Sequence, residues 1–371
     1  MAKNIVVCCD GTGNKFGAQN SNVIKLYKML KHDSSQATYY HPGVGTMGAK
    51  SALTWIGKTW TKVIGLAFGY GLSENIADAY EFLMRTYEPG DRIYVFGFSR
   101  GAYTARALCG MLYQLGLMTD GNEGQIPYAI RLLKGKIDFD VNREFKKTFA
   151  NDRDCPVHFV GVWDTVSSVG WVYNAVTFPS TANNPELKTV RHAVSIDERR
   201  AFFRQNLFIP APSQDVAQVW FPGVHSDVGG SYPEDQSQLS QIALQWMVCE
   251  AERAGLLLKA DIKAVVLGGQ PPYLKPDPTG QIHKSLHGLW WIAEVWPKLH
   301  RKKWDDKWRT GIRLNLARRR PIAEGSLLHV AVEQRMQAVA KYRPSNLCPL
   351  EELRQKYKIV EDRCETQSAA G

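Results

Sequence analysis

The 371-residue sequence lacks the long apolar run that a membrane-spanning protein needs. No stretch reaches the roughly 18 consecutive apolar residues of a transmembrane helix. The N-terminal run NIVVCCD is too short for the core of a secretory signal peptide, and no small-residue cleavage site follows it. We therefore expect a protein made in the cytoplasm without a signal peptide or a transmembrane segment, which leaves open only non-classical export routes.

Cysteine is too scattered for a disulfide framework or a zinc site. The seven cysteines are odd in number, and they form no Cys-x-x-Cys pair or Cys/His cluster. Cys8 and Cys9 fall in a predicted strand, and Cys109 and Cys249 fall in apolar helical stretches. This pattern predicts reduced, buried thiols. We expect neither a metal nor an organic cofactor.

The sequence also lacks an evenly spread positive charge, although its net charge is +10. Residues 284–320 hold eleven Lys and Arg residues and three acidic ones, so the rest of the chain is nearly neutral. Basicity confined to one segment indicates a surface patch rather than a property of the fold. A hydrophobic content of 44% with 11% aromatic residues is typical of a packed protein and excludes a disordered one.

What the sequence does contain is an alternation of apolar, strand-like runs with amphipathic helical segments. We predict strands at 4–10 and 92–98, a strand and loop at 37–46, a strand from 155 that ends at Asp164 and one from 217 that ends near His225. We predict helices at 21–32, 73–87, 100–115 and 239–255. Such alternation implies right-handed crossovers and a mostly parallel sheet with helices on both faces. We expect a single domain over residues 1–365, an insertion at 271–321 and a frayed tail at 366–371.

Polar residues follow several of the predicted strands. They are Asp10–Asn14, Ser99, Asp164 and His225–Asp227. Ligands of open parallel sheets bind at the carboxyl ends of the strands. The sequence therefore predicts a single site at that edge of the sheet.

The segment Gly97-Phe98-Ser99-Arg100-Gly101 matches the G-x-S-x-G pattern between a predicted strand and a predicted helix. The pattern holds its serine in a strained turn, where larger residues at the two glycine positions would clash. The hydroxyl then lies at a helix N-terminus, which favours developing negative charge. Ser99 is our candidate nucleophile, and the alternative is a tight turn without a catalytic role.

A nucleophilic serine needs a base, and the base needs an orienting acid. Asp164, in GVWDTV, follows an apolar strand, where a charged group needs a reason. His225, in PGVHSDVGG, lies in a polar, glycine-flanked loop after another strand. We predict His225 as the base and Asp164 as the acid. A competing assignment uses Asp227 as the acid and His329 as the base.

An oxyanion hole needs two N–H groups near the serine. One is expected from Arg100, the residue after the nucleophile, and the other from the loop Gly11-Thr12-Gly13. Asp10 is expected to order that loop through its side chain.

The insertion at 271–321 begins with proline-rich QPPYLKPDP and then becomes rich in tryptophan and basic residues. The residues expected in a lid or membrane contact are Trp290, Trp291, Trp296, Arg301, Lys302 and Trp304. Tryptophan beside lysine and arginine suits an anionic membrane interface, and it would also suit single-stranded nucleic acid. The alternative is a lid helix that packs its tryptophans inward. We favour a lid or a peripheral membrane contact over nucleic acid.

With these residues in place, the chain resembles the α/β-hydrolase family that includes the type VI secretion phospholipase effectors. The segments that carry the resemblance are VVCCDGTGN, GVGT, YEPGDRIYVFGFSRGAYTAR, GVWDTVSSVG, FPGVHSDVGGSY and YRPSNL, which span residues 4–347. The resemblance implies an α/β-hydrolase-like fold and a serine esterase or A-type phospholipase, with Ser99, Asp164 and His225 at the family's catalytic positions. The late His-x-Ser-Val-like element of the family reads His-Val-Ala-Val at 329–332, without its serine.

These observations predict a carboxylic ester hydrolase that acts on an ester or phospholipid through an acyl-enzyme. The second hypothesis is a catalytically degenerate hydrolase fold that binds nucleic acid or anionic lipid through its basic insertion.

Overall fold

The computed structural model describes most of the chain. The described residues are 2–11, 19–43, 60–135, 138–151, 155–166, 170–171, 174–175, 178–201, 203–286, 291, 294, 298–304 and 307–364. For residues 60–70, 170–171, 174–175, 298–304 and 307–313, the description covers the backbone alone. The expected tail at 366–371 lies outside the described residues.

Within this part of the chain, eight strands form one parallel sheet in the order β2-β1-β3-β4-β7-β8-β11-β12. The strands are β1 (Asn4–Cys9), β2 (Gln36–His41), β3 (Arg92–Phe98), β4 (Val157–Trp163), β7 (Thr189–Ser195), β8 (Asp215–Phe221), β11 (Leu327–His329) and β12 (Lys358–Val360). The central strands are near-continuous apolar runs, as expected for strands covered on both faces. The predicted α/β fold, with a mostly parallel sheet, is confirmed.

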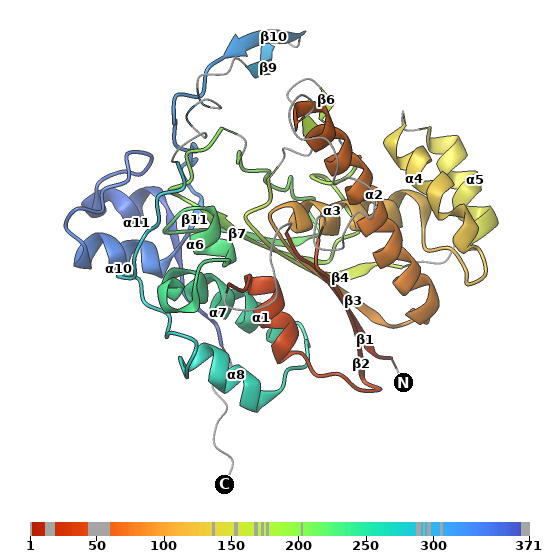
Figure 1. Ribbon diagram of the computed structural model, residues 1–371, viewed down its shortest axis with the longest axis horizontal. Helices are drawn as coiled ribbons and strands as arrows, with labels where there is room; N and C mark the ends of the chain where they lie inside the picture. Colours follow the sequence, from red (N-terminus) through yellow and green to blue (C-terminus); the bar gives the residue numbers. More distant parts are fainter. Residues whose placement is uncertain are drawn as a thin grey trace.

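Helices cover both faces of this sheet (Figure 1). One face packs against α1 (Asn22–Met29), α7 (Gln238–Arg253) and α8 (Ala260–Leu267). The other packs against α2 (Trp60–Thr86), α3 (Arg100–Leu115), α4 (Ile126–Lys134) and α5 (Phe139–Ala150). The edge at β11 and β12 is covered by α10 (Val330–Ala338) and α11 (Leu353–Lys356). A short helix, α6 (His225–Gly229), follows β8.

The two cores divide the side chains of each central strand by alternation. In β1, Ile5, Val7 and Cys9 lie in the core beneath α2 and α3, whereas Val6 and Cys8 lie in the core beneath α1 and α7. Because successive side chains of a strand point to opposite faces, one apolar run serves both layers. Packing on both faces holds each strand in place in the sheet. The residues of the candidate site follow the carboxyl ends of these strands.

The predicted helices agree with the structure except at one end. Ser21 caps α1 as expected, and its hydroxyl accepts a hydrogen bond from the Ile24 N–H at 3.3 Å. The prediction that α2 begins near residue 73 is wrong, because the helix already begins at Trp60. Its first part contains three glycines, at 65, 69 and 71, and these obscure the helical pattern in the sequence.

Within the segment 271–321, two strands form an antiparallel hairpin that projects from the body of the molecule (Figure 1). Its strands are β9 (Lys298–Trp304) and β10 (Lys307–Arg313). The alternative of a helical lid is therefore wrong for these residues. A second small hairpin pairs β5 (Gly170–Trp171) with β6 (Asn174–Ala175).

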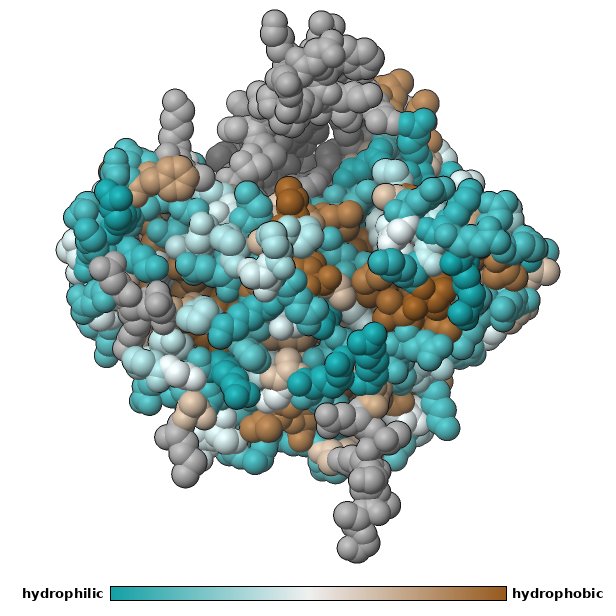
Figure 2. All heavy atoms as spheres, turned by 180° about the vertical axis from the view of Figure 1, so that it is seen from behind, coloured by the Kyte–Doolittle hydropathy of each residue, from teal (hydrophilic) through white to brown (hydrophobic). Residues whose placement is uncertain are grey.

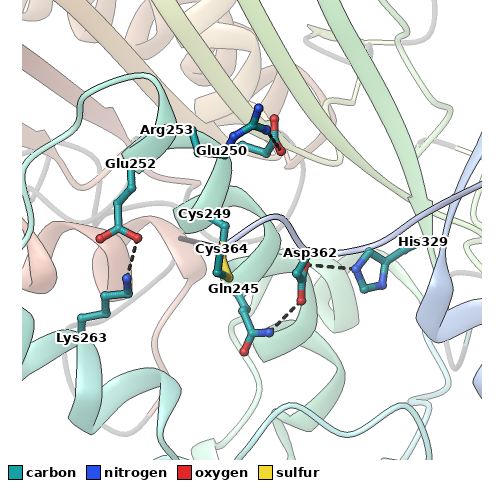
Figure 3. The surroundings of a disulfide bond; sticks show 9 residues. All are labelled: Gln245, Cys249, Glu250, Glu252, Arg253, Lys263, His329, Asp362 and Cys364. Carbon is teal, nitrogen blue, oxygen red and sulfur yellow. Dashed lines mark hydrogen bonds and ion pairs between the residues drawn. A yellow bond between two sulfur atoms is a disulfide. The ribbon is translucent and has the colours of Figure 1, made fainter. Parts of the chain in front are cut away.

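The expectation that the cysteines are reduced is wrong for one pair. Cys249 of α7 forms a disulfide bond with Cys364, which lies after β12 (Figure 3). The two residues are 115 positions apart in the sequence, so their spacing gave no sign of the pairing. Cys8, Cys9, Cys109 and Cys155 are free and buried, as predicted.

The face shown in Figure 2 is mainly hydrophilic, with apolar residues gathered in separate patches. No helix among the described residues is long and apolar enough to cross a membrane.

Candidate active site

Ser99 lies at the point where the chain reverses its direction of travel across the sheet. After β1, the chain passes through α1 to β2 at one edge, and then through α2 to β3 on the other side of β1. Cys9 pairs with Gly97, and Gly97 pairs with Val162, so β1, β3 and β4 end at one level. Such a switch point leaves a crevice at the carboxyl ends of the strands, where ligands bind in this class of sheet.

The backbone at Ser99 is strained as the sequence pattern requires. Its φ of 58° and ψ of −118° lie in a region that residues with a side chain rarely adopt. A Cβ on Gly97 would lie 2.5 Å from the Gly101 carbonyl oxygen, and one on Gly101 would lie 2.2 Å from the Cys9 carbonyl oxygen. The two glycines thus allow β3, α3 and the end of β1 to approach closely around the serine.

The His225 ring lies between Ser99 and Asp164. Its Nε2 is 2.8 Å from Ser99 Oγ, and its Nδ1 is 2.6 Å from Asp164 Oδ2. The rings of Phe98 and Phe203 pack against the imidazole, each with a centroid separation of 4.7 Å. A carboxylate only accepts hydrogen bonds, so in the neutral ring Nδ1 carries the proton and Nε2 accepts from the serine hydroxyl.

Asp164 is the most heavily hydrogen-bonded member of this group. Its Oδ1 accepts from the Ser195 N–H at 2.8 Å, and Arg320 donates to Oδ1 at 2.5 Å and to Oδ2 at 3.0 Å. Burial acts to raise the pKa of the carboxyl, but the Arg320 guanidinium and the His225 ring hold that pKa well below its usual range. Asp164 is therefore anionic at neutral pH.

The pKa of His225 is lowered from its ordinary value of about 6.5, because burial disfavours the charged ring. The hydrogen bond and charge of Asp164 oppose this effect, and the nearby Arg200 guanidinium reinforces it. The ring is therefore neutral at physiological pH and can accept a proton at Nε2.

Of the predicted loop Gly11-Thr12-Gly13, the structure describes Gly11. The Asp10 carboxylate accepts from the Gly11 N–H at 2.7 Å, from the Ser21 hydroxyl at 2.5 Å and from the Tyr40 hydroxyl at 2.9 Å. Gly11 lies close to the serine, since a Cβ at Gly11 would be 3.5 Å from Ser99 Cβ. However, its N–H is directed to Asp10, so Gly11 is not the oxyanion donor that we expected.

The remaining predicted oxyanion residues are Thr12 and Arg100. Thr12, like Gly13 beside it, lies outside the described residues. Arg100 is the first residue of α3 and directly follows Ser99. This position is the one that a donor beside the serine requires.

The structure separates the residues of the competing assignment. Asp227 Oδ1 lies 2.6 Å from Nδ1 of His283, and His329 Nε2 lies 3.1 Å from Oδ1 of Asp362. Neither residue of the competing assignment is paired with Ser99 in the described part of the chain, and that assignment is not realised.

Sequence reasoning missed two charged pairs beside the imidazole. Arg320 was counted with a solvated basic patch, yet it is 1% exposed. The Glu198 carboxylate accepts from the backbone N–H of His225 at 3.2 Å and from Arg200 Nη2 at 2.9 Å. Burial acts to raise the pKa of Glu198, but the Arg200 guanidinium outweighs it and lowers that pKa to about 2. Arg200 in turn stacks 3.6 Å from the centroid of Phe203. The sequence signal was a charged residue, Asp164, directly after an apolar strand, which indicates that some partner must compensate its charge. That signal does not identify Arg320 as the partner.

The predicted lid residues are only partly described. Trp291 is 53% exposed. Trp290 and Trp296 lie outside the described residues, and Arg301, Lys302 and Trp304 lie on β9, whose side chains are not described. Among the described residues, no group of three or more His, Cys, Asp or Glu side chains could hold a metal ion.

Comparison with known proteins gives a family and partial relatives. An uncharacterized protein of Saccharomyces cerevisiae is 40% identical over 228 residues, which are 57% of this chain and 33% of that protein. A crystal structure of an uncharacterized protein from Pseudomonas aeruginosa is 23% identical and covers 71% of this chain and 48% of that one, with a TM-score of 0.42. The Tle1 effector bound to the VgrG spike of the type 6 secretion system is 20% identical and covers 63% and 52%, with a TM-score of 0.31.

This chain therefore spans about a third to a half of the length of these relatives. The family model for the catalytic domain of Tle1-like phospholipase effectors of the type VI secretion system (T6SS) matches residues 3–250, which include Ser99, Asp164 and His225. The chain belongs to this Tle1-like phospholipase effector family.

Proposed function

We propose that this protein is a carboxylic ester hydrolase, of the phospholipase A type, that acts through Ser99, His225 and Asp164. The observation that carries the proposal is the unbroken chain of contacts from the serine hydroxyl through the imidazole to the carboxylate, at 2.8 and 2.6 Å. The strained serine backbone and the family's description as a phospholipase support it.

In the proposed reaction, Ser99 Oγ attacks the ester carbonyl carbon while His225 Nε2 takes the hydroxyl proton. The tetrahedral intermediate collapses, the C–O bond to the alcohol breaks, and His225 returns its proton to the departing oxygen. Water then attacks the acyl-enzyme in the same way and releases the fatty acid and free serine. Asp164 stabilises the imidazolium ion that forms in both steps.

The N–H of Arg100, at the start of α3, would donate to the oxyanion, where the helix dipole also favours negative charge. One such donor is worth about 3–4 kcal/mol in comparable enzymes. With Gly11 directed to Asp10, the second donor is proposed to come from Thr12 or the residue after it.

The proposed substrate is a phospholipid, and the basic hairpin is its proposed approach to an anionic membrane. The hairpin carries Lys298, Arg301, Lys302, Lys303, Lys307, Arg309 and Arg313. It projects from the body of the molecule (Figure 1), and Trp291, which precedes it in the sequence, is exposed. Basic residues near a membrane surface contribute about 1 kcal/mol each to binding anionic lipid.

The test is hydrolysis of short-chain p-nitrophenyl esters and of mixed bacterial phospholipids by wild type and by Ser99→Ala. We expect wild type to be active and to react with a fluorophosphonate probe at Ser99, and we expect the folded variant to lose both properties. Ser35→Ala, at an exposed turn, is the matched control and should retain both. Full activity in Ser99→Ala would contradict the proposal. An unlabelled, inactive wild type that binds anionic vesicles or DNA in a salt-sensitive way would instead support a binding module.

A further inference from the structure

Arg320 holds the acid of the proposed triad in a two-pronged grip. Its Nη1 donates to Asp164 Oδ1 at 2.5 Å, and its Nη2 donates to Oδ2 at 3.0 Å. Nη1 also donates to Ser195 Oγ at 2.8 Å, and Nε donates to the Phe203 carbonyl at 3.1 Å. Both ionic side chains are 1% exposed. A planar guanidinium that binds both oxygens of a carboxylate fixes its plane as well as its position.

Stability alone does not explain this pair. Removing two charges from water is costly, and a buried ion pair is often no more stabilising than apolar residues of similar volume. Asp164 already receives a hydrogen bond from the Ser195 N–H and one from His225. The Arg320 guanidinium is therefore better explained by a role in the reaction than by a contribution to stability.

We propose that Arg320 is a positioning residue for the hydrolysis, which keeps Asp164 ionised and turned so that Oδ2 meets His225 Nδ1. This inference rests on the proposed function. Arg320 acts on the reaction through Asp164, and we assign it no direct role at Ser99.

The chain around Arg320 is anchored firmly enough for this task. Arg319 forms an ion pair with Asp197, and Asn346 Nδ2 donates to the Arg320 carbonyl at 3.0 Å. Further upstream, the buried Glu294 carboxylate accepts from the Ala317 N–H at 2.8 Å. Arg320, which binds Asp164, thus lies in the anchored segment that follows the hairpin strand β10 in the sequence.

The effect of the Arg320 charge on the His225–Asp164 pair has a definite sign. Besides Arg320, the charged groups around this pair are Glu198 and Arg200 near His225, and the neutral but titratable His192 lies near Asp164. These groups stay in place when Arg320 alone is changed. Loss of one positive charge beside the pair makes proton uptake by the pair easier. The acidic limb of kcat/KM must then move to higher pH.

The experiment compares Arg320→Gln, Arg320→Lys and the matched control Arg318→Gln, at an exposed position of the same arginine run, with wild type. Each variant is titrated with a fluorophosphonate until labelling is complete, so that kcat is expressed per competent site. For Arg320→Gln we expect kcat to fall at least about tenfold, yet by less than the roughly 10⁴-fold that loss of the acid itself causes. Its acidic limb should move to higher pH, because the loss of a positive charge beside the pair favours the protonated imidazole.

Arg320→Lys retains the positive charge but cannot bind both Asp164 oxygens in the same plane. We expect its acidic limb of kcat/KM to stay at the wild-type pH and its kcat to lie between those of wild type and Arg320→Gln. Arg318→Gln should match wild type in both readouts. A purely structural role would lower the titrated fraction and move neither readout per site. An unmoved limb with unchanged kcat in Arg320→Gln would overturn the inference.

If Arg320→Gln does not fold, an unchanged kcat in Arg320→Lys overturns the inference by itself. If wild type has neither esterase activity nor labelling, the proposed function fails, and this inference fails with it. An active wild type with an inactive Ser99→Ala separates the two cases.

Discussion

Two buried histidines on neighbouring parts of the sheet have almost the same surroundings. His225 follows β8 and is paired with Asp164, whereas His329 ends β11, the strand next to β8, and is paired with Asp362. Both rings also pack against phenylalanine, with His329 stacked 4.7 Å from the centroid of Phe221. The two imidazoles are similarly buried and each faces a carboxylate, although the Asp164 side chain is 1% exposed and that of Asp362 is 19% exposed.

They differ at the ring nitrogen that faces away from the carboxylate. In His225, that nitrogen meets the Ser99 hydroxyl at 2.8 Å. In His329, it accepts from the Ala331 N–H at 3.2 Å and so caps α10 (Figure 3 shows its pairing with Asp362). A histidine–carboxylate pair is therefore no sign of catalysis by itself. What the second nitrogen contacts distinguishes a base from a helix cap.

The largest effect expected from this comparison is on the base. His225→Ala should lower kcat by about 10⁶-fold, because loss of the base in a comparable triad costs about that much. His329→Ala should leave kcat within about twofold and lower the free energy of unfolding by about 1 kcal/mol, the typical value of a helix cap. Ester hydrolysis and thermal unfolding followed by circular dichroism measure the two effects.

The contrast depends on both variants being folded, which the circular dichroism spectra establish. Equal losses of activity in the two folded variants would contradict the separation of the base from the cap.

The next effect concerns the two acids. Asp164→Asn should lower kcat by about 10⁴-fold, because an amide stabilises the wrong tautomer of the imidazole. Asp362→Asn should change kcat by less than about twofold, since its amide oxygen can still accept from His329 Nε2. Initial rates measured on the same ester for both variants make the comparison. Similar kcat values for the two variants would show that Asp164 does not orient the base.

Much of this site could be predicted from the sequence because it depends on local patterns. An apolar run, then Gly-x-Ser-x-Gly, then helix formers places Ser99 on a strained turn with little influence from the rest of the chain. Asp164 and His225 likewise follow strands that their apolar runs reveal. The order of the strands then brings the three side chains to one edge of the sheet.

The contacts that the sequence did not predict are made over long distances by short or atypical segments. Arg320 is 156 positions from Asp164, and it stands in a run of three arginines that looks solvated. β11 and β12 have three residues each, which is too short for a periodic signal. Gly11 matched the position of a loop donor, but the direction of its N–H depends on the carboxylate of Asp10, whose orientation the sequence does not specify.

The smallest expected effect is on pH dependence. Burial lowers the pKa of His225, so the neutral, active base persists to lower pH than an ordinary histidine would allow. Activity is present above the pKa of His225 in the folded protein and is lost below it. The pH at which kcat/KM reaches half its plateau should therefore lie below about 6.5, the ordinary pKa of histidine. The pKa values of Glu198 and His192, at about 2 and about 3, lie too low to produce this limb.

The same shift links pH to stability. Between the ordinary and the lowered pKa, the unfolded chain binds a proton that the buried ring does not, so the free energy of unfolding falls as the pH falls through this window. The kcat/KM profile of His329→Ala should keep the wild-type midpoint, because the cap is not the titrating base. A midpoint at or above pH 6.5 in wild type, or a midpoint that moves in His329→Ala, would show that His225 is not the group that limits activity at low pH.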